Sequence, residues 1–284
     1  MSLFSGLDKF GLGKLEKMDV FEEEKKAPAD EKKGESSKPK VSEEELLFEK
    51  TYNCPVCDNE FHSKTVRNGK VKLLSQDTDL RPKYQTVDLL KYDAIVCPKC
   101  GYSALSRFFK FMMPAQAKLI KDNISSKFNG IQEGSIYTYD DAIERHQLAL
   151  ANTVVKKGKD SEKAYTCLKM AWLLRGKMEN LPDDTENKDK VIEELKKEEL
   201  ELLNNACDGL LSAFESEDFP ICGMDELTVT YLIADLARRT GRFELAGRWI
   251  SQVLTSRQAN ERIKNRARDI RDLLEEDKKK AGVK

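Results

Sequence analysis

Two pairs of cysteines, each spaced as Cys-x-x-Cys, constrain the fold of this chain more than any other feature. The first pair is Cys54 and Cys57 in the run Cys-Pro-Val-Cys, and the second is Cys97 and Cys100 in Cys-Pro-Lys-Cys-Gly. Each pair has the form of a tight turn that directs two thiolates at one point. Two such turns supply the four sulfurs of a closed tetrahedral zinc site, which has no open position for water or substrate. The sequence therefore predicts one structural Zn²⁺ ion.

Two alternatives to structural zinc follow from the same residues. Iron in a four-sulfur site uses the same ligand set, so the sequence leaves the metal open. A redox dithiol is the second alternative, because a Cys-x-x-Cys turn next to a helix can have a lowered thiol pKa. Two copies of the turn, each with proline after its first cysteine, favour a metal. The remaining Cys167, Cys207 and Cys222 are scattered through helical sequence, which indicates reduced thiols rather than a disulfide framework.

The charge of the chain is nearly balanced, with 49 basic and 50 acidic residues among 284. No overall attraction to nucleic acid or to a membrane follows from such a balance. The sequence has no run of about 18 apolar residues, which excludes an ordinary membrane span. Its start lacks the pattern of a secretory signal. We therefore expect a cytoplasmic protein with reduced thiols.

Composition divides the chain into four predicted segments. Residues 1–49 are predicted to be a disordered tail and linker, because glutamate, lysine, serine and proline dominate residues 22–39. Apolar residues near the start make a short docking segment an alternative to a mobile tail. Residues 50–113 are predicted to form a zinc ribbon, 114–277 a helical domain, and 278–284 a disordered tail.

The ribbon is predicted to contain a β-hairpin at 61–74 and a strand at 92–96 that runs into the second cysteine pair. Asn68-Gly69 is a strong two-residue turn signal, and apolar residues alternate with lysines beyond it. A module of about sixty residues builds little core alone, so we expect the metal to decide whether it folds. Loss of one ligand is expected to unfold the ribbon, while helices from about residue 139 onward remain folded.

The chain after Pro114 is predicted to be helical. Helices are expected at 115–128, 139–157, 160–177, 191–214 and 260–277, with two more joined by Thr240-Gly241-Arg242. The stretch from Leu236 to Ile250 resembles the middle of a tetratricopeptide repeat, in which a glycine ends one helix and an alanine lets the next cross closely. We therefore expect a mainly α fold, with a small β zinc-ribbon module followed by an antiparallel, tetratricopeptide-like helical array.

Four stretches of the chain resemble a known family. They are Cys54-Pro-Val-Cys57, the run Asp77-Thr-Asp79-Leu80-Arg81-Pro82, the run from Tyr92 to Tyr102, and the run from Ala164 to Trp172. Over about residues 45–270 the chain is similar to a bacterial family of domains of unknown function, number 2225. The resemblance implies a bacterial, cytoplasmic protein and brings no activity with it. It agrees with a zinc ribbon fused to tetratricopeptide-like helices.

Other candidate ligands have simpler explanations. His62 follows the first cysteine pair and is an alternative ligand, although a histidine on a strand is the simpler interpretation. His146 is predicted to be a solvated residue on a helix surface. Asp77 and Asp79 are of the type that holds Mg²⁺ with a phosphate, but loop aspartates more commonly bind their own backbone and neighbouring arginines. No phosphate-binding glycine loop or hydrolase motif occurs, so no catalytic residue is predicted.

The run Arg107-Phe108-Phe109-Lys110-Phe111 interleaves basic and aromatic residues, as single-strand binders do. A hydrophobic seam between ribbon and helices explains these rings more simply. We predict a non-enzymatic, zinc-binding interaction scaffold with a protein or peptide partner. A nucleic-acid-binding ribbon is the alternative function, and thiol redox or metal-dependent activity is a further one. The partner groove is predicted, from helix position, to be lined by Tyr139, Arg145, Gln147, Tyr231, Asp235 and Arg238.

Overall fold

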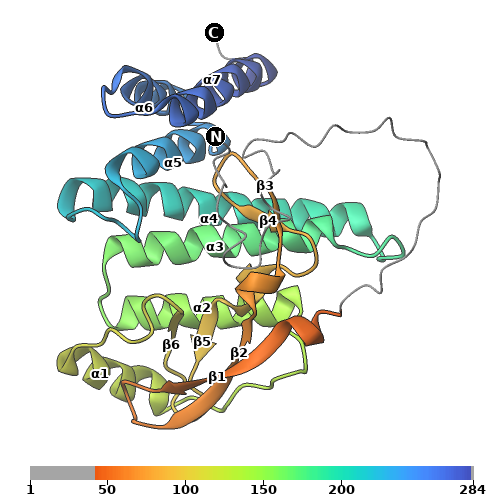
Figure 1. Ribbon diagram of the computed structural model, residues 1–284, viewed down its shortest axis with the longest axis vertical. Coiled ribbons are helices and arrows are strands. Elements are labelled where there is room, and N and C mark those ends of the chain that lie inside the picture. The colour runs from red at the N-terminus through yellow and green to blue at the C-terminus, as the bar shows by residue number, and fades with distance from the viewer. Residues whose placement is uncertain (1–41, 283–284) are drawn as a thin grey trace, which may run out of the picture. The chain divides into compact units, whose positions relative to one another are not determined.

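The N-terminal part of the described chain contains short strands that form three separate two-stranded sheets (Figure 1). The computed structural model describes residues 42–282. Following a 3-10 turn at Glu44–Leu46, the antiparallel pairs are β1 (Leu47–Asn53) with β2 (Glu60–Val66), β3 (Leu73–Gln76) with β4 (Pro82–Tyr84), and β5 (Ala94–Val96) with β6 (Ser103–Leu105). Further 3-10 turns lie at Asn68–Lys70 and Leu89–Tyr92. Each cysteine pair lies between the two strands of one hairpin, the first between β1 and β2 and the second between β5 and β6.

The rest of the described chain is mainly helical. The helices are α1 (Pro114–Ile120) with a π-helical turn at Lys121–Ser125, α2 (Tyr139–Val155), α3 (Asp160–Glu179), α4 (Lys188–Ser216), α5 (Glu226–Arg239), α6 (Phe243–Thr255) and α7 (Glu261–Ala281). Figure 1 shows α2, α3, α4 and α5 stacked in order, with α6 and α7 beyond them. The mainly α fold with a small β module is therefore confirmed. The tetratricopeptide-like assignment stays a prediction.

Helix ends follow the capping signals of the sequence. The Thr138 hydroxyl accepts a hydrogen bond from the Asp141 backbone N–H at 3.1 Å, and the Asp141 carboxylate accepts one from the Thr138 N–H at 2.8 Å. This reciprocal pair is a capping box that starts α2. Asn260 caps α7 through a 3.0 Å bond from the Ile263 N–H. Gly241 separates α5 from α6 with a φ of 75°, a conformation that glycine adopts readily.

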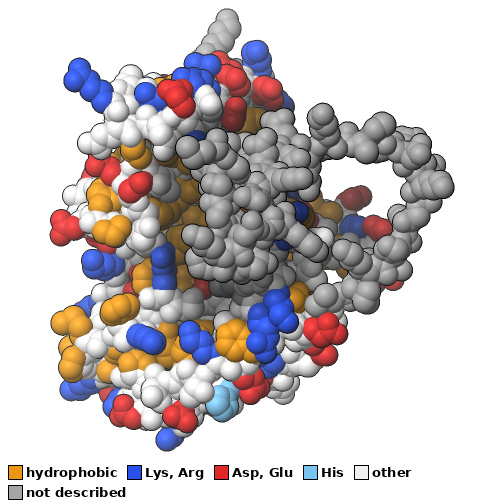
Figure 2. Space-filling view, in the orientation of Figure 1, with side chains coloured by type: hydrophobic (Ala, Val, Ile, Leu, Met, Phe, Trp, Pro, Cys, Tyr) orange, Lys and Arg blue, Asp and Glu red, His pale blue; other side chains and the backbone are white. Residues whose placement is uncertain are grey.

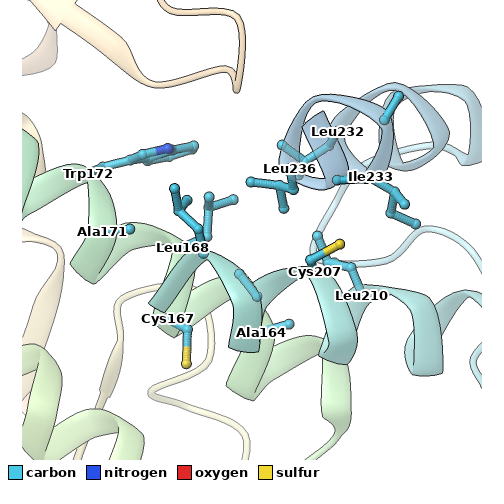
Figure 3. Close-up of a cluster of buried hydrophobic side chains, with 14 of the residues drawn as sticks. Ala164, Cys167, Leu168, Ala171, Trp172, Cys207, Leu210, Leu232, Ile233 and Leu236 are labelled. Atoms are coloured by element: carbon cyan, nitrogen blue, oxygen red, sulfur yellow. The ribbon is translucent and has the colours of Figure 1, made fainter. Parts of the chain in front are cut away.

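The main hydrophobic core lies between α3, α4 and α5 (Figure 3). Apolar residues at helical spacing give α4 one buried face, whereas α3 and α5 are buried on all sides over much of their length. Gly209 allows a close approach of α4 to α3, because a Cβ there would lie 2.8 Å from the Ala164 Cβ. The labelled residues at the centre of the core include Leu168, Trp172, Cys207, Leu210, Leu232 and Leu236.

The strand pairing differs from the predicted hairpin at 61–74. Strand β2 pairs back to β1, and β3 pairs forward to β4, so the two halves of the predicted hairpin belong to different sheets. Asn68 and Gly69 lie in the 3-10 turn that joins these sheets. The turn signal therefore correctly marks a turn, but it does not determine which strands pair with each other. Strands β1 and β4, on either side of this stretch, are the partners of β2 and β3.

Two predicted boundaries also move. Strand β1 begins at Leu47, inside the segment predicted to be disordered up to residue 49, because its residues pair in register with β2. Helix α7 continues to Ala281, past the predicted end at 277, and stops at Gly282 with a φ of 69°. The predictions for residues 1–41 and 283–284, including the docking segment, lie outside the described residues. The division into a ribbon at 50–113 and a helical domain at 114–277 stays a prediction.

Helix α2 packs directly against β5 and β6, so the β module and the helices share a buried interface. The Ser103 hydroxyl donates to the Arg145 carbonyl at 3.3 Å, and Arg145 Nε donates to the Ala94 carbonyl at 3.4 Å. From α3, Lys169 forms an ion pair with Asp93, which precedes β5. Polar groups of both parts thus hold the second cysteine hairpin against two helices.

The turn between β3 and β4 is anchored to the helices by Asp79. This carboxylate is fully buried and accepts hydrogen bonds from Trp172 Nε1 at 3.0 Å and from an Arg175 guanidinium nitrogen at 2.8 Å. Arg239 of α5 lies 3.8 Å away. Asp77 also pairs with Arg175, at 3.1 Å. The two aspartates therefore bind arginines, as the simpler interpretation of the sequence predicts.

Candidate metal centre

The four paired cysteines meet at one point. Their Sγ atoms all lie within 4.8 Å of one another. Cys54 Sγ is 3.5 Å from Cys100 Sγ, and Cys57 Sγ is 3.7 Å from Cys97 Sγ, so the closest sulfurs come from opposite hairpins. Cys57 is half-buried, and the other three side chains are buried. The fold thus brings together four soft donors from two segments that are far apart in sequence.

Both cysteine pairs lie in turns of the same build. The Asp58 N–H donates to the Cys54 carbonyl at 2.9 Å, and the Gly101 N–H donates to the Cys97 carbonyl at 3.0 Å. Asp58 and Gly101 each follow the second cysteine of a pair and have positive φ, at 57° and 71°. Glycine suits this conformation, and at position 101 a Cβ would also lie 2.5 Å from the Phe128 ring. The repeated turn explains why the two sequences converge on one site.

The donor set fits a tetrahedral four-thiolate ion. A zinc–sulfur bond of about 2.3 Å in a tetrahedron separates the sulfurs by about 3.8 Å, close to the 3.5 and 3.7 Å of the nearest pairs here. Hydrogen bonds from Cys100 and Cys54 lower the pKa of Cys97. Contacts with Cys100 and Cys97 instead raise the pKa of Cys54, because neighbouring sulfurs cannot all carry charge at this spacing. A bound cation would favour the thiolate form of all four.

An aromatic cluster packs against the cysteines. Phe109 is fully buried, and its ring centre lies 5.6 Å from that of Tyr52, 5.9 Å from that of Phe61 and 5.0 Å from that of Tyr102. The Tyr102 hydroxyl donates to the Phe109 carbonyl at 3.1 Å. These rings and three of the cysteines form one hydrophobic cluster. The cluster therefore keeps water from most of the site.

The basic and aromatic run at 107–111 is divided between the interior and the surface. Phe109 lies inside the aromatic cluster, and Phe108 packs against both that cluster and the main core. Phe111 is 74% exposed. The predicted seam between ribbon and helices therefore accounts for two of the rings. One exposed ring is a small platform for base stacking, which weakens the nucleic-acid alternative.

Asn152 of α2 supports the second cysteine turn, a role that the sequence analysis does not predict. Its Nδ2 donates to the Gly101 carbonyl at 3.0 Å and to the Leu148 carbonyl at 2.8 Å. The side chain is fully buried, and its Oδ1 has no hydrogen-bond partner within residues 42–282. The signal available in the sequence is an amide at helical spacing from Ala142 and Ala149, on the buried face of the helix.

The two histidines lie outside the four-cysteine cluster. His62 is exposed on β2, with its Nδ1 3.2 Å from the Thr51 hydroxyl, which agrees with the simpler interpretation. The prediction that His146 is solvated is wrong, because this side chain is fully buried. Its Nδ1 donates to the Ala142 carbonyl at 2.7 Å, and burial lowers its pKa to about 4. Helix α2 lies between the β module and α3, so both of those faces are covered.

The six residues predicted to line a partner groove do not form one open surface. Arg145, Tyr231 and Asp235 are buried, Tyr139 and Arg238 are half-buried, and Gln147 is exposed. The Tyr231 hydroxyl donates to the Thr78 carbonyl at 2.7 Å, so the β3–β4 turn covers this part of α5. The predicted groove is therefore wrong. Helix position alone does not reveal that the β module lies across α2 and α5.

These features define a mainly α protein whose small antiparallel β module carries four cysteines that could hold a metal ion. The chain belongs to the bacterial family described as "Uncharacterized protein conserved in bacteria (DUF2225)", whose family model matches residues 47–274. The resemblance seen in the sequence is thereby confirmed. No match was found among curated proteins or among solved structures. Within residues 42–282, none of the helices combines the length and hydrophobicity that a membrane span requires.

Proposed function

We propose that the four cysteines hold one structural Zn²⁺ ion, and that the protein is a non-enzymatic cytoplasmic scaffold that binds another protein or a peptide. The convergence of four Sγ atoms from two separate hairpins carries this proposal. A closed four-thiolate set leaves no position for water or substrate. The ion would therefore organise the fold rather than activate a reactant.

The position of the cysteines supports a structural role for the ion. Hairpins β1–β2 and β5–β6 belong to separate two-stranded sheets, with no ladder of hydrogen bonds between them. The cysteines lie where the two hairpins meet, so metal–sulfur bonds would join what the backbone leaves apart. Structural zinc contributes on the order of 10–16 kcal/mol in small peptides. A contribution of that size would decide whether this part of the protein folds.

The remaining thiols support the non-enzymatic part of the proposal. Cys167, Cys207 and Cys222 are buried, and burial raises the pKa of each thiol to about 11. Such thiols are almost entirely protonated at neutral pH and are poor nucleophiles. His146 is buried, and its low pKa keeps it neutral at neutral pH. These groups therefore act as parts of the core.

Exposed apolar side chains support the interaction part. Phe111 and Met113 are 74% and 66% exposed and lie two residues apart, directly before α1. Apolar residues scattered singly over a surface need no explanation, but neighbouring large ones mark interaction sites. The segment that carries them follows Phe109, which packs beside the cysteines. The proposed metal and the exposed surface are thus linked through one short stretch of chain.

Metal content tests the proposal. Full-length protein purified without chelator is expected to carry one zinc ion per chain. Inductively coupled plasma mass spectrometry measures the metal content, and native mass spectrometry measures the number of ions per chain. Cys57→Ser and Cys97→Ser are each expected to lose most of the metal, because three thiolates leave the tetrahedron incomplete. Cys167→Ser is the matched control, since it alters a buried cysteine outside the cluster. Wild-type protein with no metal, or stoichiometric zinc in Cys97→Ser, would contradict the proposal.

A further inference from the structure

A groove of about 870 Å³ opens beside the segment that links β6 to α1. The opposite wall is the link between α4 and α5, and the turn between α2 and α3 also lines the groove. Both walls are largely apolar. Their apolar residues are Phe108, Phe111, Met112 and Met113 on the first wall and Pro220, Ile221 and Cys222 on the second.

The first wall is a ridge that stands out into solvent. Phe111 and Met113 are too exposed to fill the interior of the groove. Met112 and Met113 also line a second hollow of about 450 Å³, together with Pro55 and Val56 of the first cysteine turn. A ridge with hollows on both sides suits a segment of another chain better than an enclosed small molecule. Methionine side chains adapt readily to the surface that covers them.

Two of the three acidic residues that line the groove, Glu162 and Glu217, are already engaged. Glu162 is paired with Lys156 at 2.6 Å, and both side chains are buried. The Glu217 carboxylate accepts hydrogen bonds from the Ser161 N–H at 2.9 Å and from the Ser161 hydroxyl at 2.6 Å. Lys159 adds a cation 4.0 Å from Glu217. These carboxylates therefore leave little negative charge for a partner to meet.

Two cations on the ridge side lack such partners. Arg107 and Lys110 are exposed, and within residues 42–282 neither has a carboxylate oxygen within 4.0 Å. Arg107 is held in place by the rings of Phe108 and Tyr165, with its guanidinium carbon 5.8 and 5.4 Å from their centres. Asp218 is an exposed carboxylate on the opposite wall. The ridge wall is thus basic as well as apolar, and Figure 2 shows hydrophobic and basic side chains side by side over the β module.

We infer that this groove binds a peptide segment of a partner protein in which apolar side chains stand next to aspartate or glutamate. The apolar side chains pack against Phe111 and Met113, and the carboxylate pairs with Arg107 and Lys110. Phe109 anchors the same wall in the aromatic cluster at the cysteines. The inference therefore rests on the metal-stabilised scaffold proposed above and names the chemistry of its partner.

Selection from a display library of short random peptides on immobilised full-length protein tests the inference. We expect enriched peptides to combine leucine, phenylalanine or methionine with aspartate or glutamate. For the best enriched peptide, the double variant Phe111→Ser/Met113→Ser is expected to weaken binding about thirtyfold. Arg107→Gln/Lys110→Gln is expected to weaken it about fivefold at low salt, as loss of two exposed ion pairs does. Leu74→Ser is the control, because Leu74 is 59% exposed on β3 and lies outside the groove. The affinity of this variant for the peptide should equal that of the wild-type protein.

Several outcomes would overturn the inference. They are no enrichment, enrichment of basic peptides, or an affinity that the ridge variant leaves unchanged. A dimer in sedimentation that the ridge variant dissociates would assign the ridge to a second copy. An apolar carboxylate retained in native mass spectrometry, and lost from the ridge variant, would assign it to a small molecule. Zinc is measured on every sample, so zinc-loaded protein without peptide binding contradicts this inference alone, whereas wild-type protein without metal contradicts the proposed function.

Discussion

The Thr78 hydroxyl donates a 2.7 Å hydrogen bond to the Asp235 carboxylate, although 157 residues separate the two in the sequence. Arg239 donates to both of them, with 2.8 Å bonds to the Thr78 hydroxyl and to Asp235. The turn between β3 and β4 is therefore fixed to α5 by charged groups as well as by packing. Asp79, the next residue of the turn, extends the same network to Trp172 and Arg175 of α3.

Replacing Asp79 with alanine is expected to lower the free energy of unfolding by about 3–5 kcal/mol, because it removes the fully buried carboxylate that accepts the hydrogen bonds of Trp172 and Arg175. Urea denaturation followed by circular dichroism measures this loss. Glu193→Ala is the control, since the Glu193–Lys197 pair on α4 is exposed, and exposed pairs contribute at most about 1 kcal/mol. Equal losses in the two variants would show that the Asp79 network does not stabilise the fold.

Phe109 and Phe111 lie two residues apart, and alanine at each position is expected to have different effects. Phe109 is fully buried against three rings, so Phe109→Ala should cost about 3–5 kcal/mol through the cavity that it leaves. Phe111 is 74% exposed, and Phe111→Ala should change stability by no more than about 0.5 kcal/mol. Denaturant midpoints of the two variants provide the comparison. A small effect at Phe109 would mean that the aromatic cluster is loosely packed.

His146 is expected to make the protein sensitive to acid. Its folded-state pKa of about 4 lies below the ordinary value of 6.5, so the unfolded chain binds the additional proton first as pH falls. The stability that the neutral form provides is complete above pH 6.5 and is lost between about pH 6.5 and 4, by roughly 3 kcal/mol in total. Burial of the ring is the main cause.

The His146→Leu variant isolates this effect, because carboxylates and thiolates titrate in both proteins. The free energy of unfolding is measured by urea denaturation at several pH values between 7 and 4. In that window the wild-type protein should lose up to about 1.4 kcal/mol per pH unit more than the variant. Parallel pH profiles would contradict the burial of a neutral histidine.

Loss of one cysteine ligand is expected to unfold more of the chain than the sequence analysis predicts, which is the ribbon alone with the helices from about residue 139 still folded. Helix α2 packs on β5 and β6, and Asn152 supports the second cysteine turn. Cys97→Ser should therefore expose α1 and α2 to protease together with the strands, and the protected fragment should begin near Asp160. Limited proteolysis with mass spectrometry locates that boundary. A resistant fragment that begins near residue 139 would show that α2 stays folded without the β module.

The helices and the cysteine turns could be predicted from the sequence because their signals are local. The 3.6-residue spacing of apolar residues, the Thr138 and Asn260 caps and the turn at Gly241 each act within a few positions. The two Cys-x-x-Cys turns are equally local, and their shared preference for one metal ion implies that they meet. Helices and turns of this kind depend on neighbours in the sequence, and the structure contains them where their signals lie.

The predictions that the structure contradicts concern contacts between segments that are distant in the sequence. Asn68-Gly69 signals a turn, but nothing near it indicates that β2 pairs with β1 rather than with β3. His146 and Arg145 are polar residues in a helix of ordinary amphipathic character, and they are buried because the β module and α3 cover two faces of that helix. Helix position predicts a groove that contains Asp235 and Tyr231, whereas the turn at Thr78 covers both residues. Burial of a residue by a distant segment is a tertiary property, so the local sequence pattern does not predict it.

The long separation between Thr78 and Asp235 has a consequence for synthesis on the ribosome. At about 5–20 residues per second, roughly 8 to 30 s pass between the emergence of these two residues. During that time the β3–β4 hairpin has no α5 to bind, and Asp79 lacks Arg239, although Trp172 and Arg175 of α3 are synthesised before α5. In a nascent chain that stalls before α5, only α3 can hold this hairpin, so the hairpin is more open to chaperones and proteases. The C-terminal third thus completes a structure that the N-terminal third begins.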